Sequence, residues 1–140
     1  MFQTILAALD ESELSEQVMK AMQQLELQPA HRVILVRVLG PAEFDSERPA
    51  DQPSIDPKLG LYRHVEQRLQ SYQAQLPCQT ELEIVTGDPA EEIVRLANIH
   101  KADLIVIGNR GLTGVNRILK GSVSSQVVND AHCSVMVVKP

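Results

Sequence analysis

The chain has 140 residues, of which 44% are apolar and 22% charged, and this composition is typical of one globular domain with its own hydrophobic core. Aromatic residues make up only 3%, which excludes a platform that stacks the bases of single-stranded nucleic acid. The formal net charge of −5 argues against a broad binder of phosphate backbones, so no nucleic-acid partner is expected.

Short apolar runs alternate with segments of helical period from the start of the chain. Residues 2–9 form a first apolar run, which predicts a buried strand that ends at Asp10. The apolar residues that follow recur at the spacing of one helix face: Leu14, Val18, Met22 and Leu25. Residues 31–38 contain a continuous β-branched run, which predicts a strand covered on both faces.

An acidic segment rich in proline interrupts this alternation at residues 40–57. Such a composition buries little apolar surface, so it predicts a mobile loop. The loop is a solvated connection or a lid over the cleft, although its negative charge would oppose an anionic ligand. Helical period returns over residues 58–76, and residues 81–86 are predicted to form a short strand.

A helix-start signal follows at Asp88, where an acid at the N-cap precedes Pro89 at the first helical position and Glu91 completes a capping box. The inner face of this helix is assigned to Ile93, Val94 and Ala97. Residues 103–108 are apolar up to a final glycine and predict a fourth strand.

The last helix is predicted to begin at Gly121 and Ser122. Its inward-facing residues are expected to be Val123, Val127, Val128 and Ala131. Residues Ser134–Val138 complete the pattern as a fifth strand. Strands that alternate with helices predict an α/β fold with a parallel sheet and right-handed crossovers, here as one domain over residues 1–140.

Neither a targeting segment nor a covalent or metal framework is evident. The N-terminus lacks a basic region, and no apolar run reaches the length of a membrane span, so we expect a soluble, cytoplasmic protein without a membrane partner. Cys78 and Cys133 match no metal or redox spacing and are expected to be reduced thiols. The four histidines lack ligand spacing, which favours surface or helix-end positions and no protein-bound metal.

Ligands of doubly wound sheets bind beyond the carboxyl ends of the strands, where neighbouring connections diverge. The first strand ends at Asp10 and the fourth at Gly108, so a cleft is expected between the loops that follow them. Asp10 could instead cap the first helix, alone or together with Ser12, and the two roles can coexist.

The loop at residues 108–122 has three cations, Arg110, Arg117 and Lys120, and no acid. Its glycines allow main-chain amides to turn toward an anion, and it leads directly into a helix N-terminus that favours negative charge. Ser122 and Ser124 add hydroxyl donors at this turn. The sequence therefore predicts a phosphate site. The spacing matches neither the dinucleotide motif G-x-G-x-x-G nor a P-loop.

The spacing Gly108-x2-Gly111-x9-Gly121-Ser122, with the strand that ends at Asp10 and the final strand Ser134–Val138, resembles the universal stress protein family over essentially the whole chain. This resemblance implies a Rossmann-like, doubly wound sheet of five parallel strands in the order 3-2-1-4-5, with helices on both faces. It also implies a homodimer and the binding of ATP, AMP or a related adenine nucleotide.

Carried over by position, the family's nucleotide site falls on three parts of this chain. The resemblance implies that backbone groups of Val38 contact the adenine, and that Asp10 accepts hydrogen bonds from ribose hydroxyls or helps to hold Mg or Mn with ATP. Ala8 stands in the wall of the base pocket, where members often have proline. The phosphate and ribose contacts are assigned to Gly108, Asn109, Arg110, Gly111, Leu112, Thr113, Gly114, Gly121, Ser122, Val123 and Ser124. Arg110 and Leu112 depart from the polar pair of some relatives.

The resemblance implies a regulatory protein of the stress response whose bound nucleotide changes the surface that it offers to a partner. No residues are assigned to catalysis, and the activity expected is at most slow ATP hydrolysis or self-phosphorylation, because Asp10 is the only acid expected near the phosphates. The alternative is a dimeric interaction module with no obligatory nucleotide. In the strand order that the resemblance implies, the strand Ser134–Val138 lies at a sheet edge and is predicted to pair with its copy in a homodimer. The alternative is an edge shielded by Lys139, Pro140 or a nearby loop.

Overall fold

A computed structural model describes residues 2–10, 13–40, 57–109 and 123–140. Most of the expected acidic loop (41–56) and of the glycine-rich loop (110–122) lies outside these ranges. The elements in chain order are β1 (Thr4–Leu9), α1 (Leu14–Gln24), β2 (Arg32–Leu39), α3 (Pro57–Gln73), β3 (Gln79–Thr86), α4 (Pro89–His100), β4 (Leu104–Gly108), α5 (Val123–Asp130) and β5 (Ser134–Val138).

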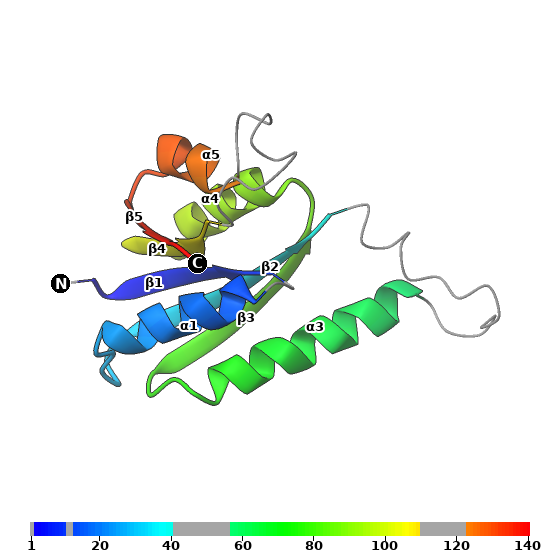
Figure 1. The fold of residues 1–140 in the computed structure, drawn as a ribbon, viewed down its shortest axis with the longest axis horizontal. Coiled ribbons are helices and arrows are strands. Elements are labelled where there is room, and N and C mark those ends of the chain that lie inside the picture. Colours follow the sequence, from blue (N-terminus) through cyan, green and yellow to red (C-terminus); the bar gives the residue numbers. More distant parts are fainter. Residues whose placement is uncertain (1, 11–12, 41–56, 110–122) are drawn as a thin grey trace.

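The strands form one parallel sheet in the order β3-β2-β1-β4-β5, which confirms the expected α/β architecture and its strand order. Helices α1 and α3 cover one face of this sheet, and α4 and α5 cover the other (Figure 1). In the centre, Ala8 of β1 lies level with Val36 of β2 and Ile107 of β4. The carboxyl ends of these three strands therefore meet at one edge of the sheet.

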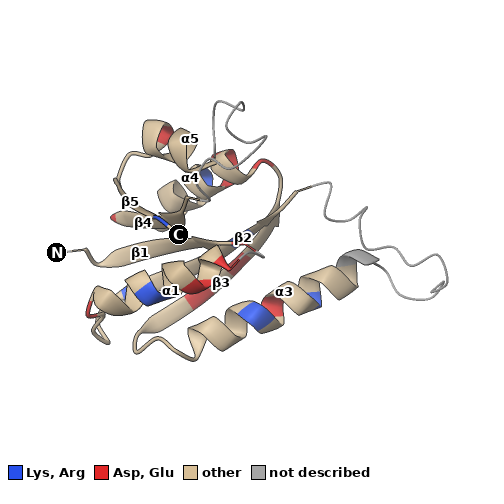
Figure 2. Cartoon of the chain, in the orientation of Figure 1, with Lys and Arg blue, Asp and Glu red and all other residues tan. Residues whose placement is uncertain are grey.

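The core lies in two layers because successive side chains of a strand point to opposite faces. Ile5 and Leu35 pack toward α1 and α3, whereas Leu6, Ile34 and Ile105 pack toward α4 and α5. Strands β1, β4 and β5 contain no charged residue, and the charges coloured in Figure 2 lie on the helices, β2, β3 and the connections. Charged groups near the ends of β1 and β4 therefore come from the connecting segments or from β2, whose Arg37 lies level with Leu9.

The predicted helix starts and faces are largely confirmed. The Asp88 side chain accepts a hydrogen bond from the Glu91 amide at 3.0 Å, with Pro89 at the first helical position. Several boundaries differ from the prediction: β3, for example, begins at Gln79 and not at residue 81. Phe2 is exposed and precedes β1, which begins where Thr4 pairs with Arg32 of β2. The helix α3 ends at Gln73, short of Leu76, because the chain must turn there to enter β3.

The prediction for the inner face of α5 was wrong at two positions. Val127 is fully buried as expected, but Val123 is 38% exposed and Val128 is 51% exposed. Ser124 is buried instead, three residues before Val127 on the same side of the helix. The side of α5 that faces the sheet therefore contains Ser124 and Val127, whereas Val123 and Val128 face away from it.

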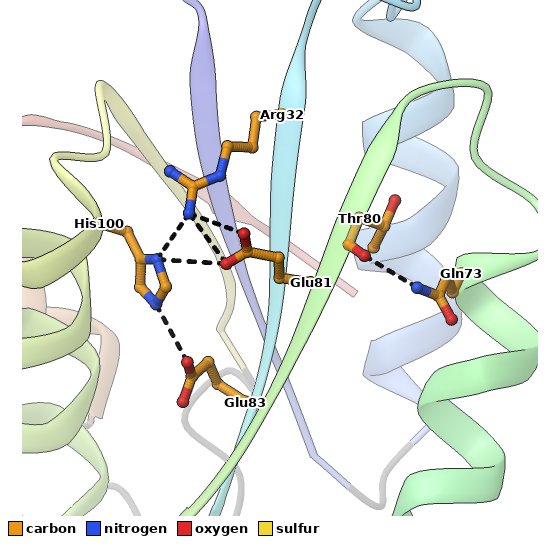
Figure 3. Close-up of polar contacts among 6 residues, drawn as sticks. All are labelled: Arg32, Gln73, Thr80, Glu81, Glu83 and His100. Carbon is orange, nitrogen blue, oxygen red and sulfur yellow. Dashed lines mark hydrogen bonds and ion pairs between the residues drawn. The ribbon is translucent and has the colours of Figure 1, made fainter.

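A polar network joins β2, β3 and α4 near the amino ends of the strands (Figure 3). Nη2 of Arg32 donates to both carboxylate oxygens of Glu81 at 2.9 Å and lies 3.1 Å from Nδ1 of His100. Nε2 of His100 lies 3.2 Å from a carboxylate oxygen of Glu83. Arg32 and Glu81 lie toward the amino ends of their strands, whereas Glu83 is level with Val36 in the middle of the sheet. The network belongs to β2, β3 and α4 and includes none of the expected site residues.

The two cysteines and the lengths of the helices were compared with the predictions. Cys78 and Cys133 are free thiols, and burial raises the pKa of each. Across the described ranges, none of the helices combines the length and apolar character that a membrane crossing requires.

The stability of the amino-end edge should depend on pH through Asp103. Its carboxylate accepts hydrogen bonds from the Thr4 and Gln3 amides, both at 2.9 Å, and these bonds hold the pKa of Asp103 below its ordinary value of 3.8. A carboxylate with a lowered pKa stabilises the fold above its unfolded-state pKa, and that stability is lost as the pH falls through the folded-state value.

We expect Asp103→Asn to lower the free energy of unfolding at pH 7, because it weakens the hydrogen bonds to the Gln3 and Thr4 amides. The loss should be only about 0.5–1 kcal/mol, since the carboxylate is exposed and screened by solvent. The loss should shrink once the pH falls below about 4, where the unfolded-state carboxylate becomes protonated, and should vanish below the lower pKa of the folded state. Urea unfolding at pH 7 and pH 3 measures both values. An equal loss at the two pH values would contradict this assignment.

Candidate functional site

The connections that follow β1, β2 and β4 begin at one edge of the sheet. Asp10 follows β1, Gly40 follows β2 and Asn109 follows β4. The helices α1, α4 and α5 also begin at this edge, because each returns antiparallel to the strand that precedes or follows it (Figure 1). Helix N-termini carry partial positive charge, so this edge is suited to an anionic ligand.

Asp10 is held by the side chain of Ser15. The Ser15 hydroxyl accepts a hydrogen bond from the Asp10 amide at 2.8 Å and donates to the Asp10 carbonyl at 2.7 Å. The same hydroxyl lies 3.3 Å from Oδ1 of Asp10. The N-cap position of α1 is occupied by Glu13 and not by Asp10, and Glu13 makes no side-chain cap bond. Ser12 lies outside the described residues.

Gly108 lies against the first residue of α1. A Cβ atom at Gly108 would overlap Cγ of Leu14 and come within 2.6 Å of its Cδ2, and Leu14 is itself buried. The close approach of α1 to β4 therefore requires glycine at this position, whatever the loop that follows it binds. The next residue, Asn109, donates its amide to the Val138 carbonyl at 2.8 Å, which fixes the exit of β4 beside β5.

Val38 is buried near the end of β2, and its carbonyl already takes part in a hydrogen bond. Nη1 of Arg37 donates to this carbonyl at 2.7 Å, and Arg37 is only 5% exposed. A carbonyl oxygen has two lone pairs, so the Val38 carbonyl retains room for a second donor. Ala8 is half-buried between β2 and β4, on the side of the sheet that faces α4 and α5.

The structure thus places seven of the fourteen expected site residues. Ala8, Asp10, Val38, Gly108 and Asn109 lie at or next to the carboxyl ends of neighbouring strands, and Val123 and Ser124 begin α5. Ser124 is buried, whereas Val123 is exposed. The other seven lie outside the described residues: Arg110, Gly111, Leu112, Thr113, Gly114, Gly121 and Ser122. Arg117 and Lys120 lie outside them as well.

Two residues of this edge were missed by the sequence analysis. Ser15 looked like an ordinary helix residue, since a hydrogen bond to a residue five positions earlier leaves no periodic pattern. Arg37 had a usable signal, because it is the only charged residue inside the apolar run from Val33 to Leu39. Among the residues that the structure describes, no group of three or more His, Cys, Asp or Glu side chains is arranged to hold a metal ion.

The described part of this edge combines an oriented acceptor with a positively polarised surface. The Asp10 carboxylate can accept hydrogen bonds from hydroxyl groups, and the N-terminus of a helix can bind a phosphate. A ligand that carries both a polyhydroxylated ring and a phosphate would match this arrangement.

Comparisons with known proteins identify the family of this chain. Residues 1–139 match the sequence model of the universal stress protein family. A universal stress protein of Thermus aquaticus is 33% identical over 99% of this chain and 100% of its own length. The solved structure of protein MJ0577 of Methanocaldococcus jannaschii has a TM-score of 0.82, with 29% identity over 100% of this chain and 97% of that one.

A second solved structure, a universal stress protein in complex with cAMP, has a TM-score of 0.72. It is 24% identical and covers 99% of this chain and 97% of that one, so it supports the fold. Its bound ligand is an adenine nucleotide.

The contact between Gly108 and Leu14 can be tested by a double-mutant cycle. Gly108→Ala should lower the free energy of unfolding by about 1–3 kcal/mol, because its Cβ overlaps Leu14. Leu14→Ala removes buried side-chain volume and should cost about 2–4 kcal/mol. In the double variant the overlap is relieved, so its loss of stability should be smaller than the sum of the two single losses. The difference should be at least about 1 kcal/mol. Additive losses in urea unfolding would show that the two residues do not make this contact.

Proposed function

Because this chain belongs to the universal stress protein family, we propose that it binds an adenine nucleotide, ATP or AMP, at the carboxyl edge of its sheet. The observation that carries the proposal is the pairing of β1 with β4, which brings Asp10 and Gly108 to the ends of neighbouring strands. The adenine nucleotide held by a structural neighbour supports the same ligand class.

In this proposal each part of the edge contacts one part of the nucleotide. Asp10 accepts hydrogen bonds from the ribose hydroxyls, and the backbone of Val38 contacts the adenine beside Ala8. The phosphates take main-chain and hydroxyl donors from Gly108, Asn109, Val123 and Ser124 and from residues 110–114 and 121–122. Mg or Mn would accompany ATP through its phosphates, with Asp10 nearby.

We assign the bound nucleotide a regulatory role in the stress response, in which occupancy of the edge changes the surface offered to a protein partner. Slow ATP hydrolysis or self-phosphorylation is the second candidate, and it rests on Asp10 alone. A cytoplasmic location belongs to the same proposal and is supported by the two free thiols, which suit a reducing compartment.

The nucleotide is tested by equilibrium binding of labelled ATP to protein purified free of nucleotide, with unlabelled AMP as competitor. We expect saturable binding, and Gly111→Leu should weaken it at least tenfold, or about 1.4 kcal/mol, because a bulky side chain blocks the approach of the main chain to the phosphates.

The matched control is Gly60→Leu in α3, where an added Cβ meets nothing within 4 Å. This variant should bind as the parent does. If the folded parent shows no saturable binding at millimolar ATP, or if both variants bind as the parent does, the proposed function is wrong, and the interaction module without a nucleotide becomes the better account.

We also propose that the chain forms a homodimer through β5. This strand pairs with β4 on one side, and its residues from Val135 to Val138 are partly exposed apolar side chains. The other outer strand of the sheet, β3, is less suited to pairing with a second chain. Its Thr80 carbonyl already accepts a hydrogen bond from Nε2 of Gln73 at 2.8 Å (Figure 3). Unpaired apolar edges are templates for another strand.

Met136→Lys should convert the dimer into a monomer in sedimentation equilibrium, since a charge on this edge repels its symmetry copy while the aliphatic stem still covers the core. Thr86→Lys at the exposed end of β3 is the control and should leave the dimer intact. A parent protein that sediments as a monomer, or a dimer that survives Met136→Lys and dissociates with Thr86→Lys, would rule out the β5 interface.

A further inference from the structure

We propose that Ser15 is a positioning residue that fixes the Asp10 carboxylate for recognition of the two ribose hydroxyls. This inference rests on the proposed nucleotide site and assigns a role within it to a residue of α1. It predicts that Ser15, which contacts neither nucleotide, contributes to the difference in affinity between a ribonucleotide and its dideoxy analogue.

The hydrogen-bonding capacity of one hydroxyl carries the first step. Ser15 Oγ has one hydrogen and two lone pairs. One lone pair accepts from the Asp10 amide at 2.8 Å, and the hydrogen lies between the Asp10 carbonyl at 2.7 Å and Oδ1 at 3.3 Å. Both main-chain polar groups of Asp10 are therefore bonded to one atom, which restrains the backbone from which the Asp10 side chain leaves.

The burial of Ser15 carries the second step. Its relative exposure is 2%, and a buried hydroxyl costs free energy unless it is hydrogen-bonded. The bond is not a helix cap, since Glu13 occupies the N-cap position of α1. The two bonds from Ser15 to the main chain of Asp10 therefore account for a buried serine at this position.

The packing of α1 carries the third step. Leu14, the neighbour of Ser15, lies against Gly108 at the end of β4. The first turn of α1 therefore contacts both sides of the proposed site, with Ser15 at Asp10 and Leu14 at the start of the glycine-rich loop. A carboxylate held in this way pays little ordering cost when it accepts hydroxyl donors.

The test compares the dissociation constants of AMP and 2′,3′-dideoxy-AMP, which lacks both ribose hydroxyls, by calorimetry. The parent should bind AMP at least about tenfold more tightly. Ser15→Ala should reduce this ratio at least about fivefold while the affinity for dideoxy-AMP stays within about twofold, since the phosphate and adenine contacts remain.

Three companion variants separate positioning from a loss of fold. Ser15→Thr keeps the hydroxyl and should restore the ratio, whereas Ser15→Cys keeps the volume with a weak donor and should reduce it as alanine does. Ser71→Ala in α3 is the control for the loss of a serine hydroxyl. The Ser71 hydroxyl donates to the main-chain carbonyl of Arg68 at 2.6 Å, and its removal should leave the ratio unchanged. In an Asp10→Asn background, Ser15→Ala should have no further effect on the ratio.

The outcomes distinguish this inference from the proposal on which it rests. If the folded parent binds neither nucleotide, the proposed function fails. If the parent binds both equally, or if Ser15→Ala and Ser15→Cys weaken both nucleotides by the same factor, Ser15 does not position Asp10 for the ribose and the inference is overturned. Should Ser15→Ala not fold, the Ser15→Cys and Ser15→Thr ratios decide in the same way.

Discussion

The parallel pairing of β1 with both β2 and β4 is the constraint on which the arrangement of this protein depends. It sets Ala8 level with Val36 and Ile107, so the three strands reach their carboxyl ends together. From that edge the chain leaves β1 through α1 on one face, while α5 follows β4 on the other. The connections diverge from this point, and residues far apart in sequence, such as Asp10 and Gly108, come to lie at neighbouring strand ends.

The start of α1 turns this topology into a defined site. Two consecutive residues of the helix face different partners, since Leu14 packs on Gly108 and Ser15 bonds to Asp10. The glycine that opens the loop is therefore required by packing as well as by any ligand. The charged network of Arg32, Glu81 and His100 joins β2, β3 and α4, and none of its residues takes part in the contacts at the start of α1.

The sequence predicted the strand order, the Asp88 cap and the edge position of β5, because these depend on local patterns and on a family resemblance that spans the chain. It failed where tertiary contacts decide. The period of the apolar residues in α5 could not show that Ser124 would be buried and Val128 exposed. The bond from Ser15 to Asp10 joins a strand end to a helix turn, and no spacing rule predicts it. Arg37 could have been found, since a cation inside a buried strand needs a partner.

The central claim is that the nucleotide binds at the carboxyl ends of the strands and not at their amino ends. A titration of nucleotide-free, isotope-labelled protein with AMP, followed by amide chemical shifts, tests it most directly. The account predicts saturable shifts at Ala8, Asp10, Asn109 and Ser124, with none at Arg32, Glu81 or His100. Shifts concentrated at the amino ends of the strands, or scattered evenly over the sheet, would contradict it.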